Sequence, residues 1–171
     1  SFTLQSIVFD ADGTTTYTIN INNVDTTELI TLGPATQPYT VSINSVIFSL
    51  KLVRSSYLHC ALFYLAPPSS SSSSSSAKAT LSMNTVTITS TPRSPLDPGY
   101  MTSSLIDATN GILTLTSVTF QHIFLDNAPL LRIPVDGTSF SMSACTFFAI
   151  TRRTGSGSVF EFTVPSSATS A

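Results

Sequence analysis

The stretch LTLTSVTF at 113–120 contains, in eight residues, the pattern that decides the fold of this chain. Apolar residues alternate with Thr over its first four positions, which is the period of a strand with one buried face. Ser117 interrupts the alternation, and Val118 and Phe120 resume it. The pattern predicts a strand that bends at a small residue and continues with its apolar side chains still facing inward.

Five copies of this phrase occur along the chain. They are FTLQSIVF at 2–9, VSINSVIF at 41–48, LSMNTVTI at 81–88, LTLTSVTF at 113–120 and FSMSACTF at 140–147. All twenty apolar positions are filled, whereas a repeat-free chain with 42% apolar residues would fill about eight. The fifth position always holds a small residue, predicted to form a corner at which a hydroxyl bonds local backbone: Ser6, Ser45, Thr85, Ser117 and Ala144.

A second apolar phrase follows each copy. It is LITL at 29–32, LFYL at 62–65, LIDA at 105–108, LLRI at 130–133 and VFEF at 159–162. Each repeat is therefore predicted to be strand, corner, strand, variable loop, strand and turn, with turn signals such as Asn110-Gly111. One such unit cannot bury its inward face, but stacked units can. The copies are 39, 40, 32 and 27 residues apart, because only the strands must keep register.

The rhythm of LTLTSVTF and of TGSGSVFEF at 154–162 resembles the Ser/Thr-rich β-helical repeats of large surface proteins of microbial eukaryotes. More widely, it resembles the right-handed parallel β-helix of pectin-lyase-like proteins. The resemblance implies an all-β chain with about five coils, and a single domain over 1–171. Its first coil is the least typical, with a long excursion at 10–28. An antiparallel β-sandwich or jelly roll is the alternative, because it also has many short strands at regular spacing.

Charged residues make up only 9% of the chain, against about 25% in an ordinary globular protein. The net charge of −2 argues against a nucleic-acid partner, because phosphate binding needs clustered Lys and Arg. No apolar run reaches the roughly 20 residues of a membrane-spanning helix. The neutral surface rich in Ser and Thr is typical of an extracellular or cell-surface protein. The doublet Arg152-Arg153 is predicted to lie in a solvated loop.

A Ser-rich insertion occupies 67–78, and a short tail occupies 165–171. Runs of Ser cannot bury apolar area, so the insertion is predicted to be a flexible loop that leaves the helix. It is either a tolerated surface insertion or a platform for O-glycosylation. The candidate acceptors in the second case are Ser69, Ser70, Ser71, Ser72, Ser73, Ser74, Ser75 and Ser76.

The acidic residues do not form the paired carboxylates that glycoside cleavage requires. Asp107 and Arg132 occupy corresponding positions in adjacent repeats, alongside Tyr64 and Glu161, and are predicted to form a surface ion pair. We therefore expect no catalytic residues and no cofactor.

Metal and thiol chemistry have weak signals. Asp10 and Asp12 resemble the start of a calcium loop, but Gly13 comes too early for an EF-hand, and an Asx-bonded turn is the other interpretation. His59 and His122 lack ligand spacing, so no metal site is assigned to them. Cys145 is expected to be a buried free thiol, with a disulfide to Cys60 as the alternative.

Repeat stacks normally end in caps, and no amphipathic capping helix is evident at either end of this chain. Open ends present unpaired backbone groups to other chains. The chain is therefore expected to be either a fragment of a longer β-helix or a protomer that stacks end to end. In the second case self-association is predicted through Phe2, Leu4, Ile7 and Phe9 at one end and Val159, Phe160, Phe162 and Val164 at the other.

The first functional hypothesis is a non-catalytic extracellular structural protein that stacks head to tail into a filament and carries O-glycans. The second is a carbohydrate-binding or polysaccharide-cleaving domain with sugars held in loops 10–28 or 89–102. A segment of a trimeric adhesin or viral fibre is a third.

Overall fold

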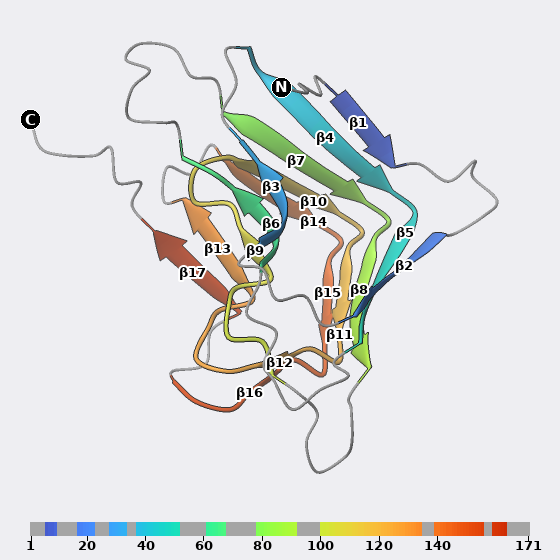
Figure 1. Ribbon diagram of the computed structural model, residues 1–171, viewed down its shortest axis with the longest axis vertical. Helices are drawn as coiled ribbons and strands as arrows, with labels where there is room; N and C mark the ends of the chain where they lie inside the picture. The colour runs from blue at the N-terminus through green and yellow to red at the C-terminus, as the bar shows by residue number, and fades with distance from the viewer. Residues whose placement is uncertain are drawn as a thin grey trace, which may run out of the picture.

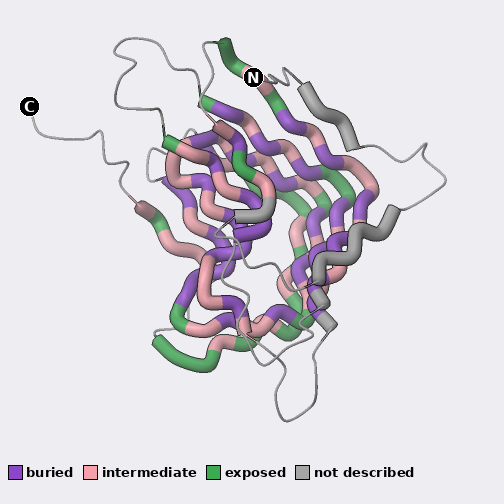
Figure 2. The backbone as a smooth tube through the Cα atoms, in the orientation of Figure 1, coloured by how far each residue is buried: buried purple, intermediate pink, exposed green. Residues whose placement is uncertain are grey.

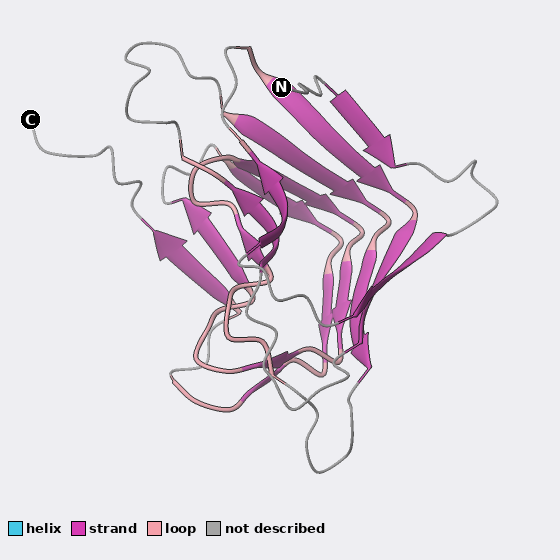
Figure 3. Cartoon of the chain, in the orientation of Figure 1, coloured by secondary structure: helices cyan, strands magenta, loops and turns pink. Residues whose placement is uncertain are grey.

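The computed structural model describes residues 6–9, 17–22, 28–33, 37–51, 61–67, 78–91, 100–134, 139–155 and 159–163. Within these ranges every regular element is a β-strand (Figure 3). The all-β prediction is therefore confirmed for the described residues.

Three five-stranded sheets form the sides of the molecule (Figure 1). The first contains β1 (Ser6–Phe9), β4 (Tyr39–Asn44), β7 (Ala79–Asn84), β10 (Ile112–Thr116) and β14 (Phe140–Ser143). The second contains β2 (Tyr17–Asn22), β5 (Val46–Lys51), β8 (Thr87–Thr91), β11 (Thr119–Gln121) and β15 (Thr146–Phe148). The third contains β3 (Glu28–Leu32), β6 (Ala61–Leu65), β9 (Ile106–Asp107), β13 (Leu131–Pro134) and β17 (Phe160–Thr163).

A shorter fourth sheet pairs β12 (Phe124–Leu125) with β16 (Thr151–Arg152), and a bridge from Met101 to Leu125 extends it. Each described strand pair is parallel, and neighbours within a sheet come from successive repeats. The chain thus winds through five coils of a parallel β-helix, as the sequence predicts. The alternative β-sandwich or jelly roll is wrong, because those folds pair their strands antiparallel.

Four corners follow the predicted pattern and show why it exists. Ser45, Thr85, Ser117 and Ala144 have φ of 54°, 55°, 53° and 51°. A residue in the left-handed conformation turns the strand, and this conformation is unfavourable for residues with bulky side chains. The corner N–H groups of Ser45, Thr85 and Ser117 donate to carbonyls of the following coil at 3.1, 3.0 and 3.0 Å. The described hydroxyl contact at these corners is from Thr85 to the side chain of Asn84, rather than to backbone.

The first coil departs from the prediction. Ser6 pairs with Thr40 and Phe9 pairs with Ile43, so β1 is the first strand of its coil. The prediction that Ser6 forms a corner is therefore wrong by five residues. The second strand of this coil is β2, which lies inside the segment 10–28 that was expected to be a long excursion. The extra residues of this coil fall between its two strands, where the eight-residue phrase allows a single corner residue.

Buried residues of successive coils lie beside one another and form columns that run through the stack (Figure 2). In the first sheet Ile43, Met83 and Leu115 are in register and fully buried. In the second sheet Phe48, Ile88 and Phe120 form the corresponding column, also fully buried. Phe63, Ile106 and Leu131 do the same in the third sheet. One continuous apolar core therefore fills the middle of the stack.

Candidate functional site

On the last coil, residues that continue the buried columns of the core are partly exposed. Met142 is the register partner of Leu115, and Phe162 is the register partner of Ile133. Leu115 and Ile133 have no exposed surface, whereas Met142 is 41% exposed and Phe162 is 62% exposed. These side chains extend buried columns, but no sixth coil covers them in the described part of the chain. The result is an apolar surface at the end of the stack.

Aromatic rings at this end of the stack contact one another and the preceding coil. Phe147 stacks on Phe120 of the preceding coil, with ring centroids 5.1 Å apart and an interplanar angle of 4°. Phe160 meets Phe147 edge to face at 5.5 Å and lies 6.3 Å from Phe140. Such contacts fix ring positions beyond what area burial alone achieves. The open end therefore has a defined shape, formed by Phe140, Met142, Phe147, Phe160 and Phe162, which we call the end surface.

A third large apolar side chain is exposed for a different reason. Phe148 is 58% exposed and pairs in register with Gln121 on the outer wall of the second sheet. Its ring meets the edge of His122 at 5.4 Å. Phe148 therefore lies outside the end surface, although its exposure is similar to that of Phe162.

The backbone at this end is also a free edge. Among the described strands, β14, β15 and β17 each have a neighbour on one side only. Inside the stack, the carbonyl groups of Val86 and Val118 accept hydrogen bonds from Thr119 and Thr146 at 2.8 and 2.9 Å. Cys145 comes after Val86 and Val118 in the same series, and its carbonyl has no following coil in the described residues. Backbone groups of this kind are a template for another strand.

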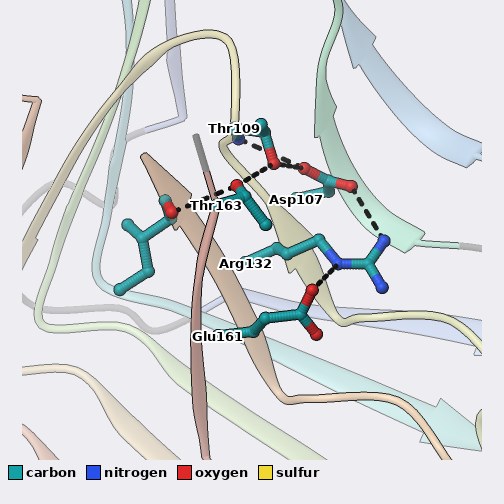
Figure 4. Close-up of polar contacts among 6 residues, drawn as sticks. Asp107, Thr109, Arg132, Glu161 and Thr163 are labelled. Carbon is teal, nitrogen blue, oxygen red and sulfur yellow. Dashed lines mark hydrogen bonds and ion pairs between the residues drawn. The ribbon is translucent and has the colours of Figure 1, made fainter. Parts of the chain in front are cut away.

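A polar ladder crosses the outer wall of the third sheet (Figure 4). The Arg132 guanidinium lies between two carboxylates, 3.6 Å from Asp107 and 3.3 Å from Glu161. Asp107 also accepts hydrogen bonds from the backbone N–H and the hydroxyl of Thr109, at 3.1 and 2.7 Å. The Thr163 hydroxyl donates to that of Thr109 at 3.1 Å, which links β17 to the ladder.

The predicted pair of Asp107 and Arg132 is thus confirmed, with Glu161 as a second partner. Both carboxylates therefore face the same cation.

A second polar cluster connects the last two coils near the fourth sheet. Arg153 binds Asp126 at 2.7 Å and lies over the ring of Tyr100, 4.6 Å from its centroid. The Thr154 hydroxyl donates to the other oxygen of Asp126 at 2.7 Å. These hydrogen bonds, that of Thr154 first, lower the pKa of Asp126. The prediction of a solvated loop for the basic doublet holds for Arg153, which is exposed in a bend, and is wrong for Arg152, which lies in β16.

The outer faces of the first two sheets carry neutral hydroxyl columns. Ser42, Ser82, Thr114 and Ser141 are in register along the first sheet. Thr87, Thr119 and Thr146 are in register along the second. These described Ser and Thr residues therefore lie in rows along the two sheets.

Several predicted site residues lie outside the described residues. These are Phe2, Leu4, Asp10, Asp12, His59, Cys60, Val164 and the serines at 69–76. Ile7 and Phe9 lie in β1, in register with the buried Val41 and Ile43. Val159 and Phe160 are half-buried at the open end. The carbohydrate loops proposed at 10–28 and 89–102 are partly strands, because β2, β3 and β8 take residues from them.

Cys145 carries a free thiol that is half-buried and packs against the core. The expectation of full burial is not met, because its coil is the last one described. Met142 was not predicted as a self-association residue, although its place in the repeat at 140–147 marks it as an inward residue. Among the described residues no three His, Cys, Asp or Glu side chains gather as a metal site, and none forms a helix suited to crossing a membrane.

Comparison with protein-family models, with curated proteins and with solved structures finds no match for this chain.

Proposed function

We propose that this chain is a structural module of an extracellular or cell-surface assembly, and that copies stack head to tail into a filament. The observation that carries the proposal is the open end surface, where Met142 and Phe162 continue buried columns yet are 41% and 62% exposed. The neutral hydroxyl columns of the outer wall and the resemblance to Ser/Thr-rich surface repeats support the extracellular setting.

A second copy is the partner that fits this surface best. The end surface needs a cover that is apolar at the centre and offers strand edges at three sides. The first coil of this same fold has three strands, β1, β2 and β3, with free edges in the described structure. A contact between two different ends of one molecule does not close on itself, so it produces a filament.

The polar ladder supports a structural role over a catalytic one. Cleavage of a polysaccharide needs two carboxylates that are free to act as acid and base. Asp107 and Glu161 instead share Arg132. The O-glycans predicted on Ser69–Ser76 remain part of the proposal as a solvated coat.

Substitution of Phe162 tests the proposal. Phe162→Glu places a charge in the end surface, where burial against another copy would be unfavourable. We expect sedimentation and electron microscopy to show filaments for the wild-type chain and monomers for Phe162→Glu. The unfolding midpoint of the dilute monomer is expected to change little, because the side chain is 62% exposed.

Phe148→Glu is the matched control, because Phe148 is 58% exposed but lies on the outer wall. It should assemble like the wild type. Equal loss of assembly in both variants would point to general apolar association. A wild-type protein that stays monomeric at high concentration would refute the proposal.

A further inference from the structure

We infer the register of the junction between copies: β14 of one copy lies parallel to β1 of the next, β15 to β2, and β17 to β3. This inference rests on the proposed head-to-tail assembly and specifies its partner surface residue by residue. The junction then repeats the step that already joins neighbouring coils within the chain.

The columns of the first sheet agree at both ends of the stack. One column runs from Phe9 through Ile43, Met83 and Leu115 to Met142. Continuing it places Phe9 of the next copy over Met142, which is 41% exposed in the single chain. The neighbouring column ends in Phe140 and begins with Ile7 in the same way.

The other two sheets give the same match. Ile19 is in register with Phe48, so it begins the column that ends in Phe147. Ile30 is in register with Phe63 and begins the column that ends in Phe160.

Apolar residues therefore meet apolar residues in all three sheets. A slip of one residue would instead place inward positions against outward ones.

Backbone and outer-wall groups also fit this register. Thr18 occupies the position of Thr119 and Thr146, whose N–H groups donate to the carbonyl of the preceding coil. The junction gives the Cys145 carbonyl the same donor, the N–H of Thr18 in the next copy. On the outer wall, Thr31 of the next copy lies beside Glu161, so no like charge opposes that carboxylate.

Paired cysteines test the register directly. Val8, Ser42, Ser82, Thr114 and Ser141 form one column, so Val8 of one copy should lie beside Ser141 of another. Neighbouring strands are about 4.8 Å apart, within the range that a disulfide accepts. In a background with both native cysteines replaced, Val8→Cys with Ser141→Cys should give a ladder of covalent multimers on mild oxidation.

Two controls set the scale. Ser82→Cys with Thr114→Cys joins neighbours within one copy and should give an intrachain disulfide without a ladder. Val8→Cys with Ser143→Cys is displaced by two residues, roughly 6.6 Å along the strand, which takes the Cα atoms beyond about 7 Å. That pair should give no ladder.

A second in-register pair repeats the test in the second sheet. Thr18→Cys with Thr146→Cys should also give a ladder of covalent multimers.

The outcomes separate the register from the function. Filaments seen by microscopy without cross-linking of the in-register pairs would overturn the register and leave the proposed function standing. Disulfide-linked dimers of the Ser141→Cys single variant would show that two copies meet through their last coils, and would also overturn the register. Absence of assembly in the reduced variants and in the wild type would overturn both. Circular dichroism of each reduced variant establishes that it is folded.

Discussion

At the scale of single residues, the corner is a backbone device. Thr85 adopts φ of 55°, in the left-handed region that is unfavourable for β-branched residues. Its side chain is exposed. Nothing in the packing of the core requires Thr at this position. Its N–H is what the stack uses, through the bond to the Thr116 carbonyl at 3.0 Å. The side chain therefore adds strain that another residue would lack.

Replacement of Thr85 by Gly should stabilise the fold. A non-glycine residue in the left-handed region stores about 1 to 3 kcal/mol, whereas the extra backbone entropy of Gly in the unfolded chain costs roughly 0.5 to 1 kcal/mol. We expect Thr85→Gly to raise the free energy of unfolding by about 1 kcal/mol in urea titrations. Thr87→Gly, two residues on in β8, should lower it by a similar amount. A loss in both variants would show that the Thr85 side chain contributes to the corner.

Asp126 gives the fold a defined response to acid. Its folded-state pKa is lowered by Thr154 and Arg153, so its contribution to stability is fully present above the unfolded pKa of about 3.9. That contribution declines as pH falls through the folded pKa. Wild type should exceed Asp126→Asn in stability near pH 6, and the difference should vanish in strong acid. Thr154→Val should raise the NMR titration midpoint of Asp126; an unchanged midpoint would assign the effect elsewhere.

At the scale of elements, the repeat predicted most strands because strand period and inward burial coincide. Leu113 and Leu115 are buried and Thr114 is not, as the alternation requires. The strand boundaries of the first coil were predicted wrongly, because the apolar residues of Ser6–Phe9 fit the eight-residue phrase either before or after its corner. The pairing of Ser6–Phe9 with Thr40–Ile43 decides that they come before the corner. The alternation in YTININ at 17–22 was the available signal for β2.

Other elements and sites left no signal of their own. β12 and β16 contain two residues each, too few for any period to appear. The partner of Arg153 also could not be predicted, because Asp126 lies 27 residues earlier and meets it only when the coils stack. The end surface was anticipated at Phe160 and Phe162 through the repeat, whereas the exposed fraction of each side chain depends on the packing of the last coil.

The same substitution at equivalent positions of different coils should change the free energy of unfolding by different amounts. Phe120 and Phe147 are in register and stacked, but Phe120 is fully buried and Phe147 is half-buried on the last coil. Phe120→Ala should lower the free energy of unfolding by about 3 to 5 kcal/mol. Phe147→Ala should lower it by about 1 to 2 kcal/mol in dilute solution, because less area is removed from water. Equal losses in urea titrations would indicate that the last coil is packed like the inner ones.

At the scale of the whole molecule, stability is close to a sum over coils and the interfaces between them. Each described coil contacts the next through three sheets, so adding a coil adds a similar increment. In the proposed filament, that sum would continue across copies. With five coils at about 4.8 Å, electron microscopy of the wild-type filaments should show an axial rise of roughly 24 Å per copy.

The all-parallel stacking also has a mechanical consequence. The hydrogen bonds between coils run along the axis of the stack, whereas the covalent backbone runs around it. Within one copy, a pull along the axis is therefore carried first by the hydrogen bonds and packing between coils, and the backbone still connects the coils after these contacts open. In the proposed filament, the junctions between copies would have no such covalent connection, so tension would be expected to open the filament there.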